Sequence, residues 1–211
     1  IEQYGADTLR MYEMFLGPLE QSKPWNTAGI TGVHGFLKKL TRLYKNENDW
    51  SISDEKADDK ELKALHVLIK KVNEDIEAFS FNTSVSAFMI CVNELGAMKC
   101  NKREILGPLA ILVSPFAPHL AEELWAGLGH EGGISIVSFP VHNDEYLTEN
   151  SFEYPVAFNG KMRFKEELSL EMSKDDVEKH IMSMEKTSGY LDGKSPKKVI
   201  VVPGKIVNIV L

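Results

Sequence analysis

Apolar residues recur at spacings of three and four through residues 1 to 140, which is the pattern of amphipathic helices that bury one face. The most regular stretch covers residues 58 to 79, and a second covers residues 27 to 44. In the first of these stretches the apolar positions form an uninterrupted heptad: Leu62, Leu65, Ile69, Val72, Ile76 and Phe79. A heptad of this length predicts a helix that packs along another helix.

Four shorter helices are predicted around these two, over residues 7 to 16, 83 to 95, 105 to 113 and 118 to 128. Asp7 and Thr83 are the expected N-caps of the first two, and Pro118 favours the start of the last. Short links between amphipathic helices imply antiparallel neighbours. We therefore expect an all-α helical bundle over residues 1 to 140.

The helical pattern ends near Gly129, where a stretch rich in Gly, Asn, Asp, Glu and Ser indicates a linker. Beyond it, two strands flank Asn159-Gly160, the dipeptide that best tolerates the two positive φ angles of a type I′ turn. Ser173 favours a helix start, and two further strands meet at Pro203-Gly204. The order β-β-α-β-β predicts a small α+β domain. We expect three segments: a helical domain over residues 1 to 140, a linker over 141 to 154, and an α+β domain over 155 to 211.

Charge is distributed unevenly along the chain. The 24 Lys and Arg residues and 31 Asp and Glu residues give a net charge of −7. Residues 151 to 211 hold 10 cations and 9 anions, a net +1, which leaves 14 and 22, a net −8, for residues 1 to 150. The total argues against an indiscriminate nucleic-acid coat, whereas the stretch from Asp192 to Leu211 is locally basic.

The sequence contains no recognisable catalytic motif. The chain has no phosphate-binding glycine loop, nucleophile elbow or His-x-x-x-His pair, so we expect no catalytic residue and no bound cofactor. His119 is interpreted as a buried ring that orders the corner after Pro118. Cys91 and Cys100 lack a Cys-x-x-Cys spacing, which favours free thiols in a reducing cytoplasm over a disulfide or a metal site. No apolar run approaches the roughly 18 to 20 residues that span a bilayer, so no membrane partner is expected.

Cations of the α+β domain are the strongest candidates for a binding surface. Alternation along one strand predicts that three of them share a face: Lys161, Arg163 and Lys165. Four more bracket the last hairpin: Lys194, Lys197, Lys198 and Lys205. A four-stranded sheet that brings both groups onto one basic rim attracts phosphates in a salt-dependent way, although a merely solvated face is the alternative. A second, less favoured set lies off the apolar stripe of residues 27 to 44: Lys38, Lys39 and Arg42.

Three stretches of the chain carry family motifs. The first, Tyr-Gly-Ala-Asp-Thr-Leu-Arg from Tyr4 to Arg10, resembles the segment after the mobile catalytic loop of class I aminoacyl-tRNA synthetases. The second, Ser114 to Trp125 with Ser-Pro-Phe-Ala-Pro-His and Glu-Glu-Leu-Trp, resembles a corner of their helical anticodon-binding domain. The third combines residues 159 to 163 with residues 198 to 210 and is similar to a C-terminal domain peculiar to bacterial leucyl-tRNA synthetases.

The resemblance implies the C-terminal part of a leucine-tRNA ligase. In that family the catalytic and editing sites lie upstream, so we expect Ile1 to follow them in a longer, monomeric protein. The helical domain is then a support for the tRNA body, and the α+β domain contacts the tRNA elbow through the cations named above. The implied partners are tRNA(Leu) and the upstream catalytic domain, with ATP and Mg²⁺ used by the complete enzyme and no role for DNA.

Two alternatives stay open. The first two motifs are shared with valyl-, isoleucyl- and methionyl-tRNA synthetases, so the chain can be the corresponding part of one of these enzymes. The other alternative is a free-standing helical scaffold for protein partners, with a basic tail that does not bind RNA.

Overall fold

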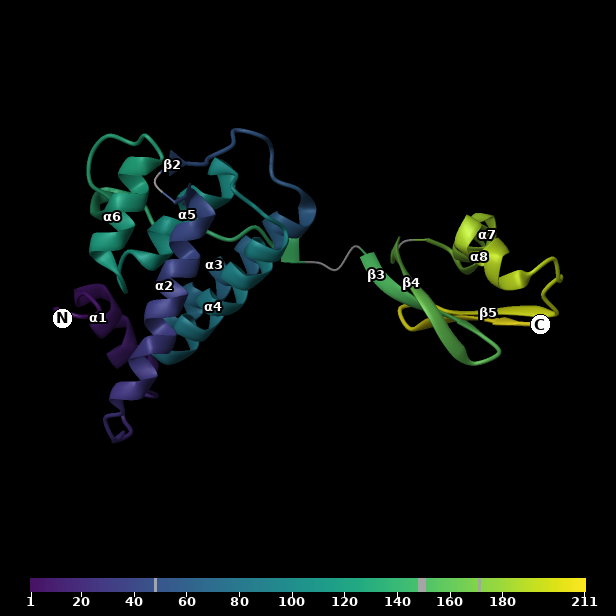
Figure 1. Ribbon diagram of the computed structural model, residues 1–211, viewed down its shortest axis with the longest axis horizontal. Coiled ribbons are helices and arrows are strands. Elements are labelled where there is room, and N and C mark those ends of the chain that lie inside the picture. Colours follow the sequence, from purple (N-terminus) through teal and green to yellow (C-terminus); the bar gives the residue numbers. More distant parts are fainter. Residues whose placement is uncertain (48, 148–150, 171) are drawn as a thin grey trace. The chain divides into compact units, whose positions relative to one another are not determined.

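Two compact units, Ile1–Leu147 and Thr148–Leu211, make up the chain in the computed structural model (Figure 1). The structure describes residues 1–47, 49–147, 151–170 and 172–211. Each unit has its own hydrophobic core, and each is therefore described by itself. Within the described ranges, no helix is long and apolar enough to cross a membrane.

The described part of the first unit is a bundle of six α-helices with short 3₁₀ segments between them. The helices are α1 (Ala6–Phe15), α2 (Ile30–Tyr44), α3 (Asp59–Glu77), α4 (Phe81–Ala97), α5 (Arg103–Val113) and α6 (Pro118–Gly127). The 3₁₀ segments are η1 (Thr27–Gly29), η2 (Ile134–Ile136) and η3 (Asp144–Leu147), and two short strands, β1 (Lys45–Asn46) and β2 (Asp49–Trp50), pair with each other. The predicted helix bundle is confirmed.

Helices α3 and α4 form a hairpin at the centre of the bundle. Asp58 begins α3 with a capping box, in which its carboxylate accepts the N–H of Glu61 while the Glu61 carboxylate accepts the N–H of Asp58. The heptad of α3 is confirmed in its middle, where Leu65, Ile69 and Val72 are buried. Phe79 lies beyond the end of α3 and is 66% exposed, because the chain turns there toward α4.

Aromatic rings fill the middle of the first core. Phe88 and Phe116 are fully buried and meet edge to face, with ring centroids 5.1 Å apart. Tyr44 is buried as well, and its hydroxyl donates to the carbonyl oxygen of Leu106 at 2.8 Å. The core therefore joins α2, α4 and α5 with the corner that precedes α6.

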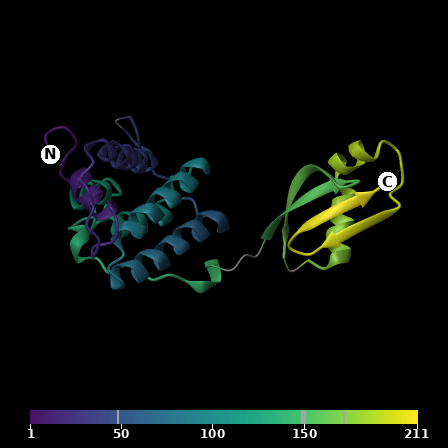
Figure 2. The same cartoon turned by 90° about the horizontal axis from the view of Figure 1, so that it is seen from below.

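The second unit is a four-stranded sheet with two helices against one face (Figures 1 and 2). Its elements are β3 (Ser151–Phe158), β4 (Lys161–Ser169), α7 (Lys174–Ser183), α8 (Glu185–Leu191), β5 (Lys198–Val202) and β6 (Ile206–Val210). The strand order is β4-β3-β6-β5, with β3 and β6 parallel and the other neighbours antiparallel. The predicted small α+β fold is thus confirmed.

Two local features of the second unit follow from the sequence, whereas the predicted single helix does not. Asn159 and Gly160 have φ angles of 48° and 78°, as a type I′ turn requires. The Ser173 hydroxyl accepts the N–H of Asp176 at 3.2 Å and so caps α7. The single predicted helix is divided in the structure, because Met184 has an extended ψ of 136° that ends α7 before α8 begins.

The linker predicted over residues 141 to 154 differs from the structure at both ends. The N–H of Asn143 donates to Nδ1 of His66 on α3 at 3.0 Å, and the His66 ring stacks on Tyr146 of η3 with centroids 4.6 Å apart. Strand β3 begins before the predicted linker ends. Residues 148–150, which also belong to the predicted linker, lie outside the described residues.

Candidate functional site

Two motif-bearing stretches of the first unit are hydrogen-bonded to each other. The Asp7 carboxylate on α1 accepts the N–H of Leu120 at 2.7 Å and lies 2.8 Å from Nδ1 of His119. Asp7 therefore caps the N-terminus of α6, where the helix dipole favours a negative charge. The prediction that Asp7 caps its own helix is wrong, because Gly5 occupies that position. The prediction of a buried His119 ring is also wrong, since its side chain is 75% exposed.

A second set of contacts strengthens the same joint. Arg10, one helical turn after Asp7, donates from Nη2 to the carbonyl oxygen of Pro115 at 3.2 Å. Just before α1, the Tyr4 ring meets the His34 ring of α2 edge to face, with centroids 5.3 Å apart. These side chains therefore hold α1 against α2 and α6, which is a structural role.

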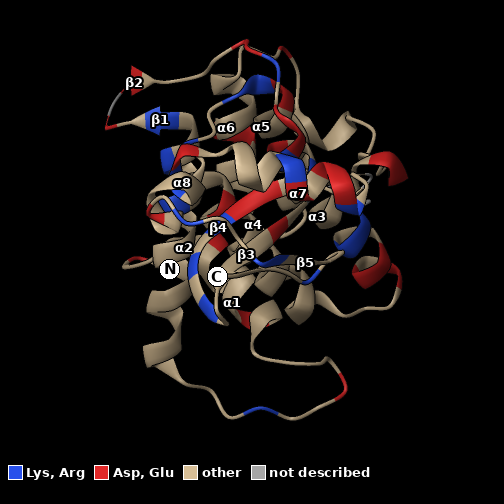
Figure 3. Cartoon of the chain, turned by 90° about the vertical axis from the view of Figure 1, so that its right-hand side faces the viewer, with Lys and Arg blue, Asp and Glu red and all other residues tan. Residues whose placement is uncertain are grey.

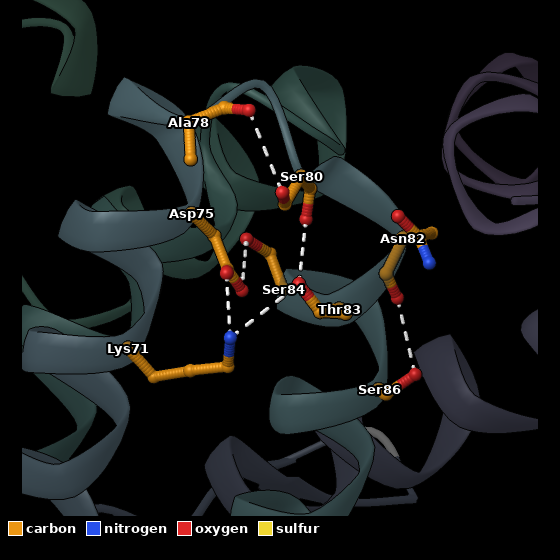
Figure 4. Close-up of polar contacts among 8 residues, drawn as sticks. All are labelled: Lys71, Asp75, Ala78, Ser80, Asn82, Thr83, Ser84 and Ser86. Atoms are coloured by element: carbon orange, nitrogen blue, oxygen red, sulfur yellow. Dashed lines mark hydrogen bonds and ion pairs between the residues drawn. The ribbon is translucent and has the colours of Figure 1, made fainter. Parts of the chain in front are cut away.

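Buried carboxylates of the first unit are also paired within it. Asp75 receives Nζ of Lys71 at 2.6 Å and the hydroxyl of Ser84 at 3.3 Å (Figure 4). Glu61 receives Nζ of Lys102 at 2.6 Å. Burial alone raises the pKa of Glu61, but the hydrogen bonds from Lys102 and from the backbone of Asp58 outweigh it and lower the pKa from 4.5. These acids connect structural elements of the first unit.

The two cysteines are buried thiols. Burial raises the pKa of Cys91 to about 12 and that of Cys100 to about 11. Because the thiolate is the reactive form, neither side chain is an effective nucleophile at neutral pH.

Helix α2 presents its three candidate cations to solvent in two directions. Lys38 and Arg42 line a hollow of about 720 Å³ bordered by α1, α2 and α6, together with His34. Lys39 faces α4, where its Nζ donates to Oδ1 of Asn93 at 3.1 Å. The set is therefore exposed but does not converge on one point.

In the second unit, the first hairpin turn meets the start of β5 and the end of β6 at one end of the sheet. Oδ1 of Asn159 accepts the N–H of Leu211 at 3.0 Å, and the N–H of Lys197 donates to the carbonyl oxygen of Val210 at 2.8 Å. Nζ of Lys197 donates to the carbonyl oxygen of Leu211 at 3.1 Å. These bonds define what we call the hairpin end of the sheet.

Four of the candidate cations lie at the two ends of this sheet. Figure 3 colours the Lys and Arg residues of the chain blue. Lys161 begins β4 and Lys198 begins β5, so both lie at the hairpin end, and Lys194 precedes β5. Lys205 lies at the opposite end, in the turn between β5 and β6. β4 and β5 are the two edge strands, about 14 Å apart for three strand spacings, so a single basic rim that joins these cations stays a prediction. Among the described residues, no carboxylate forms an ion pair with any of these four lysines.

A β-bulge breaks the expected row of three cations on β4. The β3–β4 register shifts between Val156 and Ala157, which leaves Arg163 without a cross-strand partner. The Arg163 guanidinium lies 5.6 Å from the centroid of the Tyr190 ring on α8. Lys165 instead pairs with Glu153 at 2.7 Å. The bulge changes the register of the strand, so the period of two no longer predicts a common face.

Sequence reasoning missed two residues beside this bulge. Lys186 on α8 places Nζ 5.9 Å from the centroid of the Phe164 ring, and Tyr190 stacks on the same ring. Lys186 and Tyr190 are four positions apart, which is the spacing of one helical face. The sequence could have indicated that Lys186 and Tyr190 share a face, but only if a helix had been predicted beyond Met184.

Comparisons with known proteins agree with this architecture. Residues 58–179 match the family model described as the anticodon-binding domain of tRNA ligase. The leucine–tRNA ligase of Christiangramia forsetii is 65% identical over 209 residues, which cover 99% of this chain and 22% of that protein. The leucine–tRNA ligase of Porphyromonas gingivalis is 59% identical over 211 residues, which cover 100% of this chain and 23% of that protein. The chain therefore spans less than a quarter of the length of these relatives.

A solved structure shows the same arrangement of elements. The agnB2 LeuRS of Agrobacterium radiobacter K84, crystallised as a ternary complex with tRNA and LeuAMS, matches with a TM-score of 0.61 and 25% sequence identity. The match covers 99% of this chain and 29% of that one.

The family match covers more than half of the chain, and the chain belongs to the anticodon-binding domain family of tRNA ligases. Within this family it corresponds to the C-terminal portion of bacterial leucyl-tRNA synthetases, with identities such as 65% to the ligase of Christiangramia forsetii and 54% to that of Bacteroides thetaiotaomicron. The resemblance carried by the sequence motifs is confirmed.

Proposed function

We propose that this chain is the tRNA-contacting part of a leucine-tRNA ligase and that it positions tRNA(Leu) for leucylation. The unpaired lysines of the second unit are the observation that carries the proposal. Lys161 and Lys198 stand at the hairpin end of the sheet, fixed on strands and without a carboxylate partner among the described residues. Cations held in this way contact phosphates without the cost of ordering a loop.

The two units have different tasks in this proposal. The helical unit supports the catalytic domain and the body of the tRNA, with Lys38, Lys39 and Arg42 as secondary contacts. The second unit provides the principal contacts, through Lys161, Arg163, Lys194, Lys197, Lys198 and Lys205. Lys165 contributes less, because Glu153 already pairs with it. Such contacts accelerate the reaction by orientation, since binding energy far from the reacting atoms holds the acceptor end in place.

Catalysis itself belongs to the complete ligase in this proposal. That enzyme uses ATP and Mg²⁺ to join leucine to tRNA(Leu), acts in the cytoplasm and is monomeric. The residues described here supply positioning and no step of the chemistry.

The proposal is tested in the complete ligase with Lys161→Ala and Lys198→Ala combined. We expect weaker tRNA(Leu) binding and slower leucylation, whereas leucine-dependent ATP–pyrophosphate exchange stays unchanged because amino-acid activation does not need the positioned tRNA. The matched control replaces two exposed lysines of α7, Lys174 and Lys179, with Ala. This control removes the same charge and should bind and charge tRNA like the parent. Equal effects of the two double variants, or no effect of either, contradict the proposal.

A further inference from the structure

We propose that Tyr190, Arg163 and Lys186 form a base-stacking site for RNA on the second unit. The site is built on the edge strand β4 and the short helix α8. It rests on the proposed function and adds to it, because it assigns contact with a nucleobase to residues outside the unpaired lysines. The ligand class is an unpaired or terminal RNA base together with its adjacent phosphate.

The Tyr190 ring is exposed and yet rigidly supported. It is 45% exposed, although it contacts Phe158 and Phe164 at centroid distances of 5.3 Å and 6.1 Å. The planes of Tyr190 and Phe164 differ by only 16°, so the two rings are stacked. Phe158 is buried in the core of the unit, which anchors the pair. A flat ring fixed in this way offers a stacking surface that loses little side-chain entropy on binding.

Two cations flank these rings. Arg163 is the residue that the β-bulge in β4 leaves without a cross-strand partner, and its guanidinium lies 5.6 Å from the centroid of the Tyr190 ring. Nζ of Lys186 lies 5.9 Å from the centroid of the Phe164 ring. In the described part of the chain, neither cation forms an ion pair with a carboxylate. Both charges therefore remain free to meet an anion.

This combination favours a nucleic acid over a protein partner. Tyrosine rings and arginine planes both stack on bases, and an adjacent lysine attracts the phosphate of the same nucleotide. Stacking of this kind tolerates any base, because every base has a π face. Recognition of an acidic peptide needs the two cations but does not need the exposed ring. The ring and the cations together point to an RNA nucleotide.

The proposal is tested by measuring the affinity of the 211-residue chain for a tRNA(Leu) transcript over a range of salt concentrations. Tyr190→Leu removes the stacking ring and should weaken binding roughly tenfold, with the salt slope unchanged because no charge is lost. Tyr190→Phe keeps the ring and should bind like the parent. Arg163→Lys keeps the charge but removes the planar group, so it should weaken binding at an unchanged slope.

Controls separate this proposal from loss of folding and from the proposed function. Thermal unfolding shows whether the Tyr190→Leu variant remains folded. If it does not, the affinity of the Arg163→Lys variant, which changes an exposed side chain, is used instead. Parent-like affinity of the folded Tyr190→Leu variant, or of Arg163→Lys when the Tyr190 variant does not fold, overturns the stacking site. If the stacking variants bind like the parent but the Lys161 and Lys198 double variant binds more weakly, only the stacking site is overturned and the proposed function is supported. Parent-like affinity of all these variants overturns both.

Discussion

The charged pairs of the helical unit and the strand lysines of the second unit differ in whether the charged side chain has a partner. In the helical unit the acids and bases lie between structural elements, as the Asp7–His119 and Glu61–Lys102 pairs illustrate. In the second unit the strand lysines Lys161 and Lys198 have no carboxylate partner among the described residues. Net charge alone, −8 for residues 1 to 150 against +1 for residues 151 to 211, does not fully describe this difference. What matters for binding is whether a cation already has a partner in the folded protein.

The two units also differ in the size of their cores. The first core joins all six helices, whereas the second is a small cluster between one sheet face and two short helices. A small unit buries a smaller fraction of its surface and is correspondingly less stable. Each of the following predictions tests one side of this contrast.

The largest expected effect comes from Phe116→Ala in the first core. Loss of a fully buried ring in contact with Phe88 should destabilise the helical unit by about 4 kcal/mol. Trp25, Trp50 and Trp125 all lie in that unit, so tryptophan fluorescence during urea unfolding reports on it selectively. Val156→Ala in the second core is the control and should leave the tryptophan transition unchanged. A shift of that transition by the control shows that the units do not unfold independently.

Glu61 gives the next effect and makes it depend on pH. Its folded pKa lies below 4.5, so the stability that it contributes is complete above pH 4.5 and is lost as the pH falls through the folded value. Glu61→Gln should destabilise the helical unit by about 2 kcal/mol at pH 7, the scale of a hydrogen bond to a charged group. The difference between variant and parent should shrink below pH 4.5. A constant difference from pH 7 to pH 3 contradicts this assignment.

Asp7 and Ser173 allow a comparison of a remote cap with a local one. Asp7→Ala removes the cap of α6 and should destabilise the helical unit by about 2 kcal/mol, because a charged partner is lost as well. Ser173→Ala removes a cap from α7, which begins at the next residue, and should cost the second unit about 1 kcal/mol. Chemical denaturation of both variants measures these values. If Asp7→Ala leaves the free energy of unfolding unchanged, the contacts of Asp7 with His119 and Leu120 do not stabilise the helical unit.

What the sequence predicted correctly is local in origin. The heptad of α3, the Asn159-Gly160 turn and the Ser173 cap each depend on residues a few positions apart. The remote cap was missed for the same reason, since Asp7 and Leu120 are 113 positions apart. No periodicity along the chain connects two such residues.

The candidate site was predictable only in its residue types. The basic residues of the second unit were identified, but their arrangement depends on strand order and on one bulge. Strand order places Lys161 and Lys198 on opposite edges of the sheet, and the bulge directs Arg163 toward Tyr190. Both features arise from pairing between strands, which a period of two along one strand does not contain.

His66 gives the smallest expected effect. Burial and the nearby His142 lower the pKa of His66 from 6.5, so protonation of its ring favours the unfolded or locally opened state. Its Nδ1 accepts the N–H of Asn143 and cannot do so once protonated. Hydrogen exchange at Asn143, corrected for the intrinsic rate, should therefore be faster below pH 6.5. His66→Gln should remove this pH dependence, and persistence of the dependence in that variant contradicts the assignment.

The salt dependence of tRNA(Leu) binding tests most directly whether free cations of the second unit make the phosphate contacts. Two variants are compared: Lys161, Lys194 and Lys198 all replaced by Ala, and Lys38, Lys39 and Arg42 all replaced by Ala. Each phosphate contact removed should make the slope of log affinity against log salt shallower by about 0.7 to 0.9. We expect a change close to that of three contacts for the first variant and a smaller change for the second. A larger change for the α2 variant, or an unchanged slope for the sheet variant, contradicts the account.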